Sequence, residues 1–149
     1  MLPQSGANEN KMNKFSKIII DSIFLVIFGW VFIQFVLMAL YTLAIFMPES
    51  ARGLSNLIGL VIFGFIAYAI FRSKTGTVIK AASLVALLEA VSATIGRYIG
   101  GQMIIIYSLN ALAAILVVYF LYRLKASWHY YLAVALFGLF LVYLLAMVY

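Results

Sequence analysis

The sequence predicts an all-α integral membrane protein, a bundle of five transmembrane helices. Hydrophobic residues make up 67% of the 149-residue chain, against about 45–50% in soluble domains. Charged residues make up only 9%, against roughly 25% in soluble domains. Ten basic and four acidic side chains cannot cover so much apolar surface in water, and disorder requires the opposite composition. The composition therefore excludes both a soluble globular domain and a disordered chain.

The first predicted span is an apolar run over 18–47 that ends before Pro48. Residues 1–16 are polar and are predicted to form a flexible cytoplasmic tail. A helix of 30 residues is about 45 Å long and exceeds the roughly 30 Å hydrocarbon core, so it must tilt or extend into the headgroup layers. The run is too long for a signal peptide and lacks a cleavage motif, so we expect a retained helix.

Four further apolar segments complete a single transmembrane domain over 17–149. Short charged or glycine-containing breaks separate the predicted spans 54–71, 80–99, 103–122 and 128–149. Each is close to the ~20 residues that a spanning helix needs, and continuous apolar runs are not the alternating pattern of a β-barrel. The third segment is the weakest candidate because it contains Glu89, so four spans plus one re-entrant segment is the alternative.

The basic residues predict the orientation in the membrane. With five spans, eight of the ten fall on one side: Lys11, Lys14, Lys17, Arg72, Lys74, Lys80, Arg123 and Lys125. The other side receives Arg52 and Arg97. Cytoplasmic loops collect Lys and Arg, so the N-terminus is predicted in the cytoplasm and the C-terminus outside. The net charge of +6 therefore indicates topology and not nucleic-acid binding, and we expect a bacterial cytoplasmic (inner) membrane.

Glu89 is the main candidate functional residue. It lies nine residues after Lys80, about 13 Å along the third helix and close to the bilayer midplane. Ionisable groups at this depth are costly and are functional candidates by default. Three roles remain open: a structural partner of a Tyr, Asn or Arg, a protonatable or cation-binding site for transport, and a neutral acid with one interhelical hydrogen bond.

Four other residues are candidates for ion, proton or partner contacts. Asn110 lies near the depth of Glu89 and shares a helix face with Tyr107, either as a packing face or as a polar lining. Gln34 lies within the first span. Arg97 is eight residues after Glu89 and about 80° around the helix, so a contact between these two is expected between subunits, if at all.

Other polar and small residues are expected to have structural roles. Asp21 is predicted to form an interfacial salt bridge, with Lys17 in reach four residues earlier. His129 is interpreted as an interfacial anchor, and Trp30 as a packing residue or part of a cavity lining. Small residues concentrate in the third segment, so it is predicted to lie centrally and to pack on several neighbours.

The sequence lacks the residues and motifs that most catalytic and metal-binding sites need. The chain has no cysteine and one histidine, and it contains neither a metalloprotease nor a nucleophile-elbow motif. We expect no enzymatic activity, no cofactor and no metal.

Two functions of different classes remain. The first is a small oligomeric channel- or transporter-like protein in which Glu89 is the cation- or proton-sensitive group. The second is a membrane-embedded interaction module without transport activity, such as an accessory subunit, a sensor or an immunity- or defence-type protein. The expected partners are the lipid bilayer and either further copies of the chain or another membrane protein.

Overall fold

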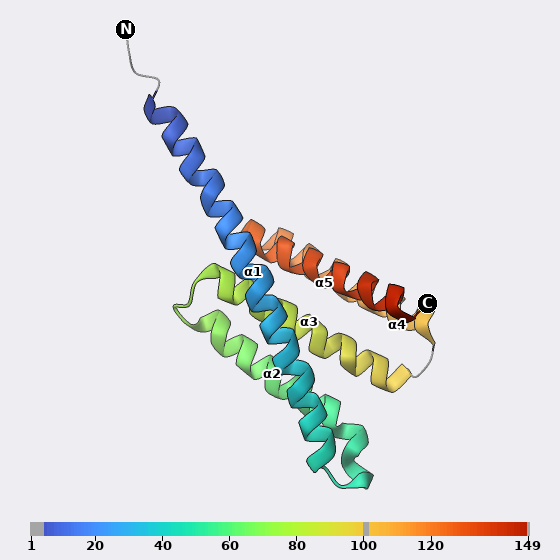
Figure 1. The fold of residues 1–149 in the computed structure, drawn as a ribbon. Coiled ribbons are helices and arrows are strands. Elements are labelled where there is room, and N and C mark those ends of the chain that lie inside the picture. The colour runs from blue at the N-terminus through green and yellow to red at the C-terminus, as the bar shows by residue number, and fades with distance from the viewer. Residues whose placement is uncertain (1–4, 100–101, 149) are drawn as a thin grey trace.

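The computed structural model describes residues 5–99 and 102–148, and the regular secondary structure in this part of the chain is all helical (Figure 1). The helices are α1 (Ser5–Phe46), η1 (Glu49–Leu54, a 3-10 helix), α2 (Ser55–Arg72), α3 (Thr77–Ile99), α4 (Met103–Arg123) and α5 (Trp128–Val148). Helices α1 to α4 are long and apolar enough to cross a membrane. The all-helical prediction is confirmed, and so is compatibility with a membrane protein. The fully described apolar stretch of α5 is shorter, Trp128–Tyr143, so a fifth span remains a prediction.

The ends of α1 differ in how well the sequence predicts them. The helix ends at Phe46, two residues before Pro48, as the missing amide hydrogen and fixed ring of proline lead one to expect. It begins at Ser5 and is 42 residues long, so the described part of the expected tail continues the helix. No proline or glycine interrupts residues 7–17, and the helix can extend from the apolar segment without a break.

Helix α3 lies at the centre of the bundle, as its small residues predict. It contacts α1, α2, α4 and α5. In its most apolar 18-residue stretch, 56% of the residues are buried, whereas the figure for α4 is 6%. Ala81, Ala82 and Val85 pack between α1 and α5, and Ala86 and Ala90 pack between α1 and α2. Alanine lets neighbouring backbones approach closely, which explains why several helices fit around α3.

Consecutive helices run in alternating directions. At one end, Asp21 of α1 contacts His129 of α5 (3.1 Å between Nε2 and Oδ2), and Phe71 of α2 stacks on Tyr130 with ring centroids 6.0 Å apart. At the other end, Asn56 of α2 donates to the Ala93 carbonyl of α3. The breaks that carry five of the predicted cytoplasmic basic residues (Arg72, Lys74, Lys80, Arg123 and Lys125) therefore lie together at the first end, here called the basic end.

Helices α1 and α2 are in very close contact at Gly59. A Cβ atom at this position would lie 2.2 Å from Cδ2 of Leu40, whereas a Cβ atom at Gly64 would meet nothing within 4 Å. The absence of a side chain at Gly59 therefore allows the α1–α2 hairpin to close.

Candidate functional site

Glu89 is enclosed by the bundle. Glu89 is 4% exposed, and its neighbours Leu88 and Ala90 are 4% and 0% exposed. Within the described part of the chain, its Oε2 atom is buried and has no hydrogen-bond partner. No Tyr, Asn or Arg of the described residues pairs with the carboxyl group, so the structural-partner role has no contact to support it.

The face of α3 that carries Glu89 also lines a hollow between α1 and α5. Glu89 follows Val85 by four residues, so both lie on one face of the helix. Val85 is on the wall of a cavity of about 160 Å³, together with Gly29, Trp30 and Phe140. Gly29 of α1 faces Val85 across this hollow, because a Cβ atom at Gly29 would be in ordinary van der Waals contact with Val85 Cγ2, at 3.8 Å. The hollow therefore ends one helical turn from Glu89.

Trp30 lies at the mouth of this hollow between α1 and α5. Its ring packs edge-on against Phe140, with ring centroids 6.4 Å apart at an interplanar angle of 78°. The side chain is 53% exposed to the exterior of the bundle. Both sequence interpretations therefore hold for Trp30, because it packs on α5 and also lines a cavity.

Asn110 is the second buried polar group with an unpaired oxygen. It is 0% exposed, and its Nδ2 donates to the Ile106 carbonyl within its own helix at 2.9 Å. Its Oδ1 receives no hydrogen bond from the residues that the structure describes. Asn110 is thus inward-facing, but its only described hydrogen bond is local and does not join α4 to another helix.

The remaining predicted site residues lie apart from Glu89. Gln34 and Arg97 are exposed, and Tyr107 is half-buried on α4. No ion pair joins Glu89 to Arg97 among the described residues, as expected for two positions on different faces of α3. Four cavities in the described part of the bundle have none of the five predicted residues in their walls. Glu89 and Asn110 are therefore enclosed, but none of these four cavities brings the predicted residues together.

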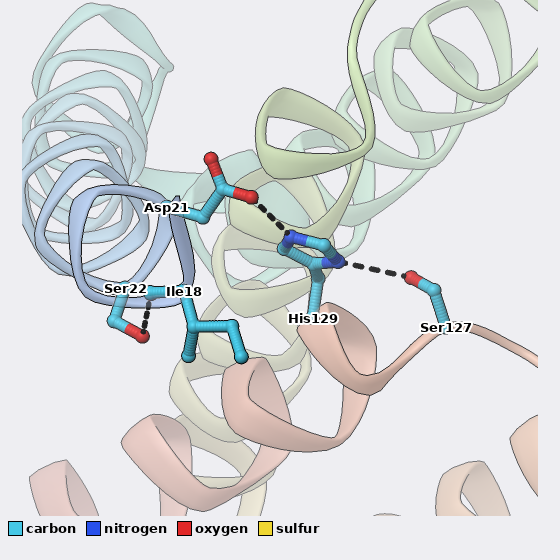
Figure 2. Close-up of polar contacts among 5 residues, drawn as sticks. All are labelled: Ile18, Asp21, Ser22, Ser127 and His129. Carbon is cyan, nitrogen blue, oxygen red and sulfur yellow. Dashed lines mark hydrogen bonds and ion pairs between the residues drawn. The ribbon is translucent and has the colours of Figure 1, made fainter. Parts of the chain in front are cut away.

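Asp21 and His129 form a polar contact that the sequence predicts only in part (Figure 2). His129 Nε2 lies 3.1 Å from Asp21 Oδ2, and His129 Nδ1 lies 3.2 Å from the Ser127 hydroxyl. Asp21 forms a polar pair, as the sequence predicts, but its partner among the described residues is His129 and not Lys17. The helical spacing suggested Lys17, whereas the packing of α5 on α1 brings in a residue 108 positions away.

Comparisons with known proteins add no family to this description. No protein-family model matches the chain, and no curated protein or solved structure matches it either.

Proposed function

We propose that this protein is a small membrane protein that binds a proton or a small cation at Glu89, as part of a transporter-like activity. The observation that carries the proposal is the buried Glu89 carboxyl group, which has an unpaired oxygen on the most enclosed helix of the bundle.

The physical argument starts from the cost of a buried charge. An ionised carboxylate without a partner is strongly disfavoured at membrane depth. Glu89 must therefore hold a proton or lie against a cation, and either ligand leaves when the site is opened to water. A group whose charge depends on an exchangeable ligand is what coupling to a proton or cation gradient requires.

The packing favours a site within a single chain. Glu89 is enclosed by the helices of its own bundle, so a second subunit is not needed to shield it. The cavity between α1 and α5 has Val85, one turn before Glu89, in its wall and offers an approach to the carboxyl group. We therefore propose that access involves separation of α1 from α5, and that any homo-oligomer has a role other than enclosing Glu89.

A membrane-embedded interaction module is the second candidate. It is favoured by the apolar walls of the α1–α5 cavity, which offer no hydrated route to Glu89. In this case the protein acts by binding another membrane protein in the inner membrane.

Proton flux in liposomes tests the first proposal. The purified protein is reconstituted with a trapped pH indicator, and flux is driven by a potassium diffusion potential of either sign. We expect the wild type to carry protons. The rate of proton flux should be about tenfold lower in Glu89→Gln, because this variant lacks the proton-binding carboxyl group. Replacing the external buffer cation tests whether sodium or potassium is carried instead.

Glu49→Gln is the matched control, because Glu49 is an exposed glutamate in η1 at the opposite end from the basic end. It should retain the wild-type rate. Absence of proton and cation flux in the wild type contradicts the transport proposal, and equal rates for Glu89→Gln and wild type contradict the role of Glu89. A stoichiometric membrane protein that copurifies with an inactive wild type supports the interaction module.

A further inference from the structure

We propose that a cavity at the basic end binds the phosphate headgroup of an anionic phospholipid. This cavity, the headgroup cavity, has a volume of about 430 Å³ and lies among α1, the start of α3 and the start of α5. Its walls include Lys17, Asp21 and His129 at the polar end, Phe24 and Phe28 further along α1, and residues 76–79 of α3.

The polar end of the headgroup cavity carries a lysine that has no ion-pair partner among the described residues. Asp21, the acid in the wall, is held by His129 at 3.1 Å, and His129 is in turn held by Ser127. Figure 2 shows this arrangement, with the histidine ring between the carboxylate and the serine hydroxyl. Lys17 forms no ion pair with Asp21 or with any other described residue, so its ammonium group remains available to an anion.

The start of α3 adds backbone donors to the same wall. The amides of Ile79 and Lys80 donate to the Gly76 carbonyl, which leaves the earlier amides of Thr77 and Val78 without an intrahelical acceptor. Among the described residues no side chain caps these amides, and the first turn of α3 contains no acid. Free amides at a helix start and a lysine are both groups that bind phosphate oxygens.

The apolar end of the headgroup cavity favours a phospholipid over a soluble phosphate as the ligand. Phe24 and Phe28 follow Asp21 by three and seven residues, so they continue the same face of α1 towards the membrane interior. Their rings stack with centroids 6.0 Å apart. A cationic end followed by an aromatic wall has the same order of polarity as a phospholipid, with its phosphate above its acyl chains. Anionic lipids are also attracted by the neighbouring Lys74 and Lys80.

Native mass spectrometry of the full chain in detergent tests this proposal. Equal amounts of phosphatidylglycerol and phosphatidylcholine are added, and the lipid retained at mild activation is counted. We expect the wild type to retain one phosphatidylglycerol in preference to phosphatidylcholine. Lys17→Gln should lower that preference by about fivefold, as expected for one lysine near the phosphate. Lys17→Arg should preserve it.

Lys14→Gln is the matched control, because Lys14 is an exposed lysine one turn earlier on α1 that does not line the cavity. It should retain the wild-type preference. Equal retention of the two lipids by the wild type overturns the proposal. Equal losses in Lys14→Gln and Lys17→Gln also overturn it, since they indicate diffuse attraction by the basic end. If inorganic phosphate abolishes the preference at millimolar concentration, the lipid assignment is wrong. None of these outcomes depends on transport at Glu89.

Discussion

Helices α3 and α4 are similar in length and both are apolar, yet they occupy opposite environments. Eleven residues of α3 are buried in the bundle: Ala81, Ala82, Ser83, Leu84, Val85, Ala86, Leu88, Glu89, Ala90, Ser92 and Thr94. In α4 the one residue described as buried is Asn110, while most of its large aliphatic side chains are exposed. The buried set of α3 thus includes alanines, serines and the acid as well as leucine and valine, whereas the exposed side chains of α4 are mainly isoleucine, leucine and aromatic residues.

This difference shows what determines the position of a helix when lipid is the solvent. Lipid chains accept a leucine as well as another helix does, so apolarity alone does not place a helix inside the bundle. Small side chains permit close packing, and polar side chains require protein neighbours. Both properties favour α3 at the centre of the bundle, and polarity is also consistent with the buried position of Asn110 in α4.

The largest expected effect comes from enlarging alanine in α3. Ala90 is 0% exposed and packs against Val36, Leu40 and Phe63. Ala90→Leu inserts three carbons into this contact and should lower the free energy of unfolding by about 3 kcal/mol. Steric trapping in bicelles measures the change. Ala111→Leu on the exposed face of α4 is the control and should have almost no effect. Equal losses for the two variants would contradict the different environments of α3 and α4.

A smaller effect is expected for a methyl group at the contact between α1 and α2. Gly59→Ala places a Cβ atom against the buried Leu40 side chain, which must change rotamer or shift α1. We expect a loss of about 2 kcal/mol in the free energy of unfolding. Gly64→Ala, on the same helix in open space, should be neutral. A larger loss of stability in Gly64→Ala than in Gly59→Ala would contradict this prediction.

Loss of the contact between Asp21 and His129 should cost less again. The pair is partly exposed, with 22% of the Asp21 side chain and 13% of the His129 side chain accessible. A double-mutant cycle of Asp21→Ala and His129→Ala should give a coupling energy of about 1 kcal/mol. The same cycle with Lys17→Ala in place of His129→Ala should give almost none. Stronger coupling of Asp21 to Lys17 would restore the pairing that the sequence suggested.

The smallest effect is expected at the opposite end of the bundle. Asn56 joins α2 to α3 by one hydrogen bond of 3.3 Å to the Ala93 carbonyl. Asn56→Ala should lower the free energy of unfolding by about 0.6 kcal/mol, the average for interhelical hydrogen bonds in membranes. A loss above about 2 kcal/mol would show that this end, and not the enclosed part of α3, holds the helices together.

The sequence predicts the helices and the central position of α3 because apolar length, proline and small residues act locally. It also singles out Glu89, since an acid within an apolar run is visible without a structure. The pairing of Asp21 with His129 and the headgroup cavity depend on how α5 packs on α1, which no spacing within one segment reveals. Gln34 and Arg97 were grouped with Glu89 by depth or sequence separation, but the direction in which each helix faces places them on the exterior.

The most direct test of the role of Glu89 is the carbon chemical shift of its carboxyl group. The chain contains three glutamates, Glu9, Glu49 and Glu89, so selective ¹³C labelling gives few carboxyl signals, and Glu89→Gln assigns the one of interest. We predict that in liposomes this signal moves with pH or on addition of the transported cation, as proton or cation binding at Glu89 requires. A Glu89 signal that stays unchanged across pH and across sodium and potassium additions would contradict it.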